Sequence, residues 1–131
     1  KDILKRTSGE ALLDLPYDTS FIAGYDNLMV ASDVAVQTYG KIIMARSGDF
    51  VGEVGSLETH CTGAVLICDI TKNDSTIYST KPEFNVNTST LTPGVMSTTS
   101  FVSGDRISFK VTQVGNSTAG QGLCFNLKCK V

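Results

Sequence analysis

The sequence predicts an all-β protein: an antiparallel, jelly-roll-like β-sandwich preceded by a short N-terminal arm. Short apolar runs separated by turn residues continue along most of the chain, and no helical periodicity follows Pro16. Near the C-terminus, apolar and polar residues alternate over two long stretches, which is typical of half-buried strands. At 131 residues, the chain has the size of one domain with one core. We therefore expect residues 1–16 to form the arm and residues 17–131 to form the β-sandwich.

The arm differs in character from the rest of the chain. Ser8 can cap one or two helical turns that end at Pro16, but so short a helix is marginal in water unless it docks on another surface. Two alternatives stay open: a flexible leader, or an arm that packs on a neighbouring subunit. The number of apolar residues favours the second, because water-exposed apolar clusters mark contact sites. The candidate subunit-contact residues are Ile3, Leu4, Leu12, Leu13 and Leu15.

The next part of the chain consists of short apolar runs divided by glycine, asparagine and aspartate. A strand that ends at Gly40 is expected to precede a second one, and a third contains Gly52 and Gly55. A glycine inside a strand marks a bulge or another backbone that passes close by. The apolar runs and expected strands cover residues 21–25, 28–31, 34–39, 41–46 and 50–57.

A β-hairpin is predicted at the centre of the chain. Residues 64–70 are almost wholly apolar, as expected for a strand that is covered on both faces. Asn73 and Asp74 then supply a turn, because both residue types tolerate the left-handed conformation that tight hairpins need. Asp69 follows the apolar run, and we expect its carboxylate to be half-buried and held by a structural hydrogen bond.

The remaining strands follow this hairpin. Pro82 interrupts pairing, so residues 84–91 are expected at a sheet edge or in a polar loop. Residues 107–114 and 123–131 then alternate between apolar and polar with a period of two, which predicts two half-buried strands. The glycine-rich residues 115–122 between them form a loop that is longer than a tight turn.

No pattern of residues points to catalysis or to a cofactor. His60 is the single histidine, and the spaced ligand pairs typical of zinc sites are absent from the sequence around it. We interpret it as a polar residue in the loop before residue 64. Carboxylate pairs can be drawn by chance in any β-protein. In this chain they would come from Glu53, Glu58, Asp69 or Glu83. We expect no enzymatic activity and no cofactor or metal.

The four cysteines are predicted to be free thiols. Cys68 lies within an apolar run and is interpreted as a small buried hydrophobic residue. Cys124 and Cys129 are five residues apart, so in one strand their side chains face opposite sides of the sheet. The fourth is Cys61.

The charge of the chain narrows the classes of partner. A net charge of −2 argues against nucleic acid or an anionic membrane surface as the principal partner. No apolar run approaches the ~20 residues that span a bilayer.

Several blocks of sequence carry a resemblance to a known kind of module. They are residues 38–40, 43–46, 52–55, 62–73, 76–80, 104–115 and 120–123. Together they resemble the β-sandwich modules of tailed-phage virions, which occur in capsid decoration proteins, head fibres and tail-fibre tips. The resemblance covers about residues 34–131. It implies a jelly-roll-like domain, commonly a homotrimer, displayed on a virion that is assembled in the host cytoplasm. It implies no catalytic residues.

Two hypotheses about function follow from this resemblance and from the apolar arm. In the first, the chain is a capsid decoration (cement) or surface appendage subunit, whose arm binds the major capsid protein or other virion subunits. In the alternative, it is the receptor-binding tip module of a tail fibre, which recognises a host surface glycan or protein. A sugar-binding surface needs exposed aromatic rings. The sequence offers Tyr25, Tyr78 and Phe84 as the nearest candidates.

Overall fold

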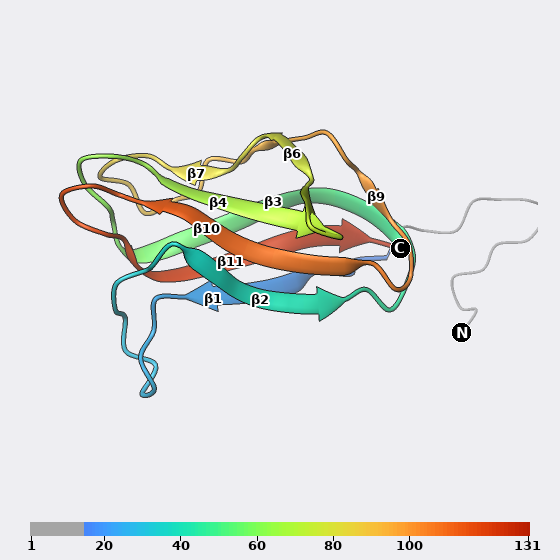
Figure 1. The fold of residues 1–131 in the computed structure, drawn as a ribbon, viewed down its shortest axis with the longest axis horizontal. Coiled ribbons are helices and arrows are strands. Elements are labelled where there is room, and N and C mark those ends of the chain that lie inside the picture. Colours follow the sequence, from blue (N-terminus) through green and yellow to red (C-terminus); the bar gives the residue numbers. More distant parts are fainter. Residues whose placement is uncertain (1–14) are drawn as a thin grey trace, which may run out of the picture.

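The computed structural model describes residues 15–131, which form antiparallel strands without a helix (Figure 1). The four candidate contact residues of the arm before Leu15 lie outside the described residues, as does the short helix expected after Ser8. The strands are β1 (Thr19–Ala23), β2 (Gln37–Ile43), β3 (Gly48–Thr59), β4 (Leu66–Lys72), β5 (Ser75–Thr76), β6 (Tyr78–Thr80), β7 (Glu83–Phe84), β8 (Val95–Met96), β9 (Ser100–Phe101), β10 (Arg106–Val114) and β11 (Gln121–Lys130).

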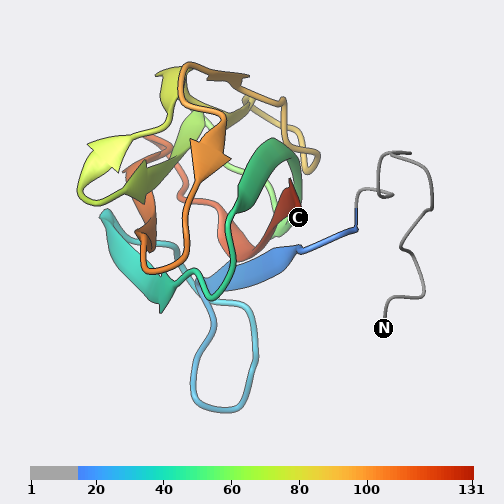
Figure 2. The same ribbon diagram turned by 90° about the vertical axis from the view of Figure 1, so that its right-hand side faces the viewer.

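Two sheets pack face to face, as the end-on view shows (Figure 2). The first sheet has the strand order β1-β11-β3-β9, and the second has the order β2-β10-β4-β5, with β7 also paired to β4. β6 and β8 pair with each other as a separate two-stranded sheet, which we call the β6–β8 ribbon. The predicted all-β, antiparallel β-sandwich is therefore confirmed. The jelly-roll detail and the division into arm and domain stay predictions.

Aromatic rings from both sheets meet in the core. Phe109 of β10 stacks on Phe21 of β1 at a centroid distance of 5.3 Å and lies 4.8 Å from Phe125 of β11. All three rings are buried. The alternating pattern accounts for this, because Ile107, Phe109 and Val111 of β10 and every second side chain of β11 point to the opposite sheet. After Val111 the register with β4 shifts, so the alternation predicted up to residue 114 is interrupted and Val114 packs against the core. Both predicted strands are confirmed.

The predicted central hairpin is also present. β4 is buried along nearly its whole length, and Thr71 pairs with Thr76 across the turn to β5. Asn73 and Asp74 have φ angles of 50° and 74°, which is the left-handed conformation expected of them. Asp74 also forms an ion pair with Arg106, at 2.7 Å. After the hairpin, β7 pairs with the edge of β4, and residues 85–91 run on from it as a mostly polar loop whose last residue, Leu91, is buried.

The prediction that Gly40 ends one strand and begins another is wrong. Residues 37–43 form the single strand β2, which passes through Gly40. A Cβ atom at this position would lie 2.7 Å from the Phe21 ring, so glycine lets the two sheets approach each other closely. The pairing of β2 with β10 also skips Tyr39, which marks a bulge beside this contact.

The two glycines of β3 behave as the sequence predicts. The register with β11 shifts next to Gly52, where Val51 is left without a partner residue in β11. At Gly55, another backbone passes close by, because the Leu91 amide donates a hydrogen bond to the Gly55 carbonyl at 3.1 Å. One glycine therefore marks a bulge and the other a close approach.

Candidate binding surface

Leu15 is the one candidate contact residue of the arm that the structure describes. Its amide and carbonyl both pair with Val131, at 3.1 and 2.9 Å, so the backbone before β1 runs alongside the end of β11. Its side chain is 39% exposed. Ile3, Leu4, Leu12 and Leu13 lie outside the described residues. The role of these five residues as subunit contacts therefore stays a prediction.

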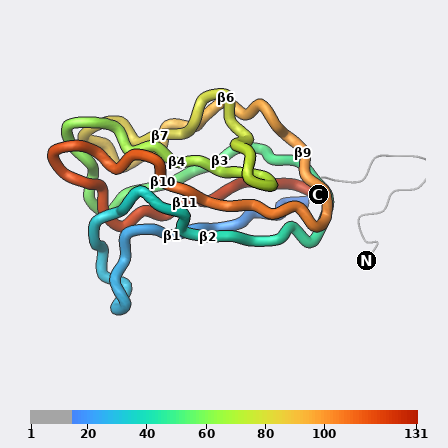
Figure 3. Tube along the Cα trace, in the orientation of Figure 1, coloured from blue at the N-terminus to red at the C-terminus, as the bar shows by residue number. Residues whose placement is uncertain are grey.

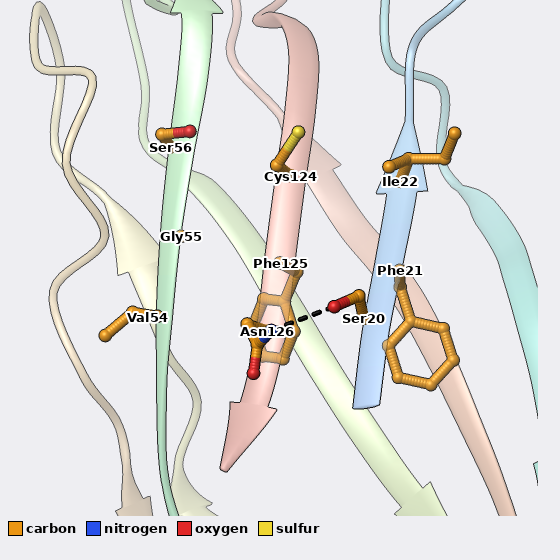
Figure 4. Close-up of a pocket in the computed structure, with 9 residues that line it drawn as sticks. All are labelled: Ser20, Phe21, Ile22, Val54, Gly55, Ser56, Cys124, Phe125 and Asn126. Carbon is orange, nitrogen blue, oxygen red and sulfur yellow. Dashed lines mark hydrogen bonds between the residues drawn. The ribbon is translucent and has the colours of Figure 1, made fainter. Parts of the chain in front are cut away.

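The outer face of the first sheet carries an open hollow of about 420 Å³, which we call the sheet depression (Figure 4). Two cross-strand rows of side chains build it: Ile22–Cys124–Ser56 and Ser20–Asn126–Val54. Small side chains occupy the middle of the face, whereas Ile22 and Val54 stand at diagonal corners with 46% and 52% exposure. The lining is mostly apolar, and Asn126 donates a hydrogen bond to Ser20 at 2.8 Å.

The two ends of the sheet depression differ in charge. Lys128 lies one outward position beyond Asn126 on β11. At the other end, the Tyr25 hydroxyl lies 3.4 Å from the Cys124 sulfur. Hydrogen bonding to Cys124 and to Glu58 raises the pKa of Tyr25, so its hydroxyl keeps its proton beside that carboxylate. The depression is therefore bounded by a cation at one end and by an acidic group at the other.

A second apolar surface lies on the loop between β1 and β2, which projects from the body (Figure 3). The side chains of Leu28, Met29 and Val30 are 83%, 59% and 57% exposed. We call these three residues the loop tip. The sequence placed them in a short apolar run among the strands, but in the described chain they belong to no strand and lie beside an isolated β-bridge between Tyr25 and Ala31.

Hydrogen bonds to and from Asp26 fix the backbone conformation of the loop tip. Its carboxylate accepts from the amides of Leu28 and Val30 at 2.8 and 2.9 Å, and its own amide donates to the Val30 carbonyl at 2.9 Å. Met29 has a φ angle of 61°, which is uncommon for a residue with a long side chain. The turn therefore presents three apolar side chains to solvent. It does so with Met29 in the left-handed backbone conformation, which costs free energy for a residue other than glycine.

The buried carboxylates have structural partners. Glu53 is 3% exposed and accepts hydrogen bonds from the Tyr78 hydroxyl at 3.0 Å and from the Gly94 amide at 2.7 Å. Asp69 is 6% exposed and accepts from the Thr76 hydroxyl at 2.5 Å, as the sequence predicts. The structure thus ties both carboxylates into the fold, whereas Glu58 is exposed and Glu83 is partly exposed.

The stability of the protein is expected to depend on pH through Asp69. Burial raises the pKa of its carboxyl, and the hydrogen bond from Thr76 offsets only part of this rise. The folded state then binds the proton more tightly than the unfolded chain, whose pKa is about 3.9. The free energy of unfolding from this group is therefore highest below about pH 4 and falls as the pH rises through the folded pKa.

An Asp69→Asn variant removes this pH dependence while it keeps an acceptor for Thr76. We expect the variant to gain stability relative to the wild type as the pH rises from about 4 to 7, because only the wild type must then bury a charge. Urea unfolding of both proteins across this range measures the difference. A difference that shrinks with rising pH would contradict the prediction.

The cysteines are free thiols, as predicted. Three are buried, and burial raises the pKa of Cys129 to about 12 and raises that of Cys68 as well. Cys124 is exposed on the outer face of the first sheet, so it and Cys129 point to opposite sides of β11, as the spacing predicts. Cys124 is thus the accessible thiol of residues 15–131, and it lines the sheet depression.

His60 is exposed just after β3, in the loop where the sequence predicts it. Among residues 15–131, no three histidine, cysteine, aspartate or glutamate residues are grouped so that they could hold a metal ion. In the described part of the chain, no helix has the length and apolar character needed to cross a membrane.

The sequence did not single out the sheet depression or the loop tip. For the sheet depression, the signal was the alternation in residues 123–131, which places Cys124, Asn126 and Lys128 on one outward face. For the loop tip, it was residues 28–31, an apolar run between turn-forming residues that has no partner strand.

Fold and surface together define a class: an all-β sandwich with exposed apolar side chains on the loop tip and at the sheet depression. No protein-family model, curated protein or solved structure matches the chain.

Proposed function

We propose that this protein is a structural subunit that works by binding other protein subunits. One observation carries the proposal: in residues 15–131, five of the exposed large apolar side chains gather in two places, with Leu28, Met29 and Val30 on the loop tip and Ile22 and Val54 at the sheet depression. Exposed apolar groups in contiguous patches mark interaction sites, because their removal from water stabilises a complex. The apolar residues of the arm add a third attachment element that the sequence predicts.

The assembly that we propose is a tailed-phage virion, on which the chain is a capsid decoration (cement) or surface appendage subunit. The resemblance of residues 34–131 to virion β-sandwich modules supports this assignment. Its partners are then copies of itself, as a homotrimer, together with the major capsid protein or other virion subunits. The free cysteines agree with assembly in the reducing host cytoplasm.

The alternative function, recognition of host glycans at a tail-fibre tip, loses part of its support. Tyr78 and Phe84 are 4% and 0% exposed, so neither ring can stack on a sugar. Tyr25 is partly exposed, and its hydroxyl is in contact with Cys124. The glycan hypothesis keeps this one aromatic residue.

Removal of residues 1–14 is expected to abolish attachment to virions and to leave the β-sandwich folded. The truncation keeps Leu15, whose backbone pairs with Val131, and so preserves the edge beside β11. The apolar residues of the arm are lost, and with them the attachment that we ascribe to them. Co-sedimentation of the purified protein with virions that lack it measures attachment, and thermal unfolding measures folding.

The matched control is a full-length chain in which Leu12 and Leu13 are both replaced by serine, which keeps the length of the arm. It should also fail to attach. Truncated protein that attaches as well as the full chain would show that the arm is not the attachment element. Immunogold electron microscopy of complete virions tests the location: label on the heads or their appendages supports the proposal, label on tail tips alone supports the alternative, and absence of label contradicts both.

A further inference from the structure

We infer that the loop tip of one copy inserts into the sheet depression of a second copy. The inference rests on the proposed function in that it names one of the partners, which is the chain itself. Both surfaces belong to the described residues: the loop tip projects between β1 and β2, and the sheet depression lies on the outer face of the first sheet, where Tyr25 at the base of the same loop borders it (Figures 1 and 4).

The two surfaces match in size and polarity. The sheet depression holds about 420 Å³, near the lower end of the ~300–1,000 Å³ of pockets that hold small ligands. Such a volume suits a few aliphatic side chains and is too small for a folded element. Leu28, Met29 and Val30 are a set of that size, and Asp26 already holds their backbone in place. A preorganised loop loses little conformational freedom on binding.

Charge gives this pairing a direction. The loop of residues 24–36 carries Asp26 and Asp33 and contains no lysine or arginine. The sheet depression has Lys128 beyond one end and Glu58 beyond the other. An acidic loop is attracted to the lysine end and repelled from the glutamate end, which orients it as it enters.

The contact joins two different patches, so it is a head-to-tail contact rather than a symmetric face-to-face one. Contacts of this kind close into rings when the rotation between copies permits it. A single loop in a shallow hollow buries less surface than the ~1,200 Å² of a typical stable interface, so closure of a ring strengthens the assembly. The homotrimer of the proposed function is one such ring.

Cys124 provides a direct test, because it lines the sheet depression and is exposed. A Leu28→Cys variant places a second thiol on the loop tip. If the tip enters the depression of another copy, mild oxidation of the purified full-length protein should yield disulfide-linked dimers and larger species on non-reducing gels. A disulfide forms only where the two Cα atoms come within about 7 Å, so random collisions contribute little.

Two controls accompany the variant. Val102→Cys places a thiol on a side chain that is also well exposed, in the turn before β10 at the opposite end of the strands (Figure 1). It should not cross-link. Adding Cys124→Ser to Leu28→Cys should abolish the cross-link. Equal cross-linking of both single variants, or none with Leu28→Cys, would overturn the inference. So would cross-linking of the wild type through Cys124 alone, which indicates that two outer faces meet.

A mixing experiment tests the head-to-tail arrangement. Leu28→Asp removes the apolar tip, and Val54→Asp places a charge at a corner of the sheet depression, so each variant alone should associate at least tenfold more weakly than the wild type. A mixture of the two retains one intact contact and should form a heterodimer by analytical ultracentrifugation, but nothing larger. Wild-type protein that stays monomeric at high concentration, or a mixture that associates no more strongly than either variant alone, would contradict the inference.

Thermal unfolding of each variant shows whether it is folded. Both substituted side chains are exposed, so we expect melting temperatures close to that of the wild type. These experiments use the purified chain without virions. Loss of the cross-link with virion attachment intact would therefore remove this inference alone, and the reverse result would remove the virion assignment alone.

Discussion

The Phe109→Ala variant should lose about 3–5 kcal/mol of its free energy of unfolding. Phe109 is 0% exposed, and its ring lies between Phe21 and Phe125 of the opposite sheet, at centroid distances of 5.3 and 4.8 Å. Truncation removes the transfer free energy of a whole ring and leaves a cavity that the two sheets cannot close without shifting their pairing. It also removes two favourable ring contacts.

Urea unfolding of the wild type and the variant measures this loss. Val102→Ala is the matched control, because it shortens an apolar side chain that is 59% exposed, and it should change stability by less than about 0.5 kcal/mol. Phe109→Leu should fall between the two, since it keeps part of the volume. A loss below about 1 kcal/mol for Phe109→Ala would mean that the sheets are not held together at this stack.

The Glu53→Leu variant should lose roughly 2–4 kcal/mol, because it leaves a buried hydroxyl and a part-buried amide without an acceptor. The Tyr78 hydroxyl and the Gly94 amide each donate to this carboxylate. An unsatisfied buried donor costs about 1–3 kcal/mol. Leucine avoids the desolvation cost of a buried carboxylate, and this offsets part of the loss. Tyr78→Phe removes only one of the two bonds, and its cost should be near ~1 kcal/mol.

The position of these hydrogen bonds predicts which part of the protein loses stability in the Glu53→Leu variant. Glu53 lies on β3, whereas Tyr78 lies on β6 and Gly94 lies just before β8, so the carboxylate ties the small β6–β8 ribbon to the first sheet. Hydrogen exchange of residues 78–96 should therefore accelerate more than exchange in β10 or β11. Glu53→Gln is the control, since its side-chain oxygen can still accept one bond. Uniform exchange throughout the chain would contradict this local role.

Predictions from the sequence were most accurate where the two-residue period of a strand alone decides which way the side chains point. Leu123, Phe125 and Leu127 face the core, and Cys124 and Asn126 do not, because successive residues of a strand alternate regardless of what surrounds them. The Asn73–Asp74 turn was equally predictable, since its backbone conformation is a property of those two residues.

The features that the sequence mispredicted or missed share one physical cause: each depends on contacts between residues that are far apart in the chain. Gly40 reads locally as the end of a strand, yet its reason is the Phe21 ring of the other sheet. The apolar run at residues 28–31 looks like a strand until it finds no partner. The sheet depression combines one face of three strands, so no local stretch of sequence describes it.

By itself, the sequence determined the fold class, the order of the main strands along the chain, and the inward face of β11 and of β10 as far as Val111. Local conformational preference and the two-residue period of a strand suffice for these properties. Only the tertiary structure decided which strands are neighbours, where Glu53 finds its two donors, and which apolar residues stay in water. These depend on how much surface remains after the two sheets have packed, and that quantity is set by contacts between residues far apart in the chain.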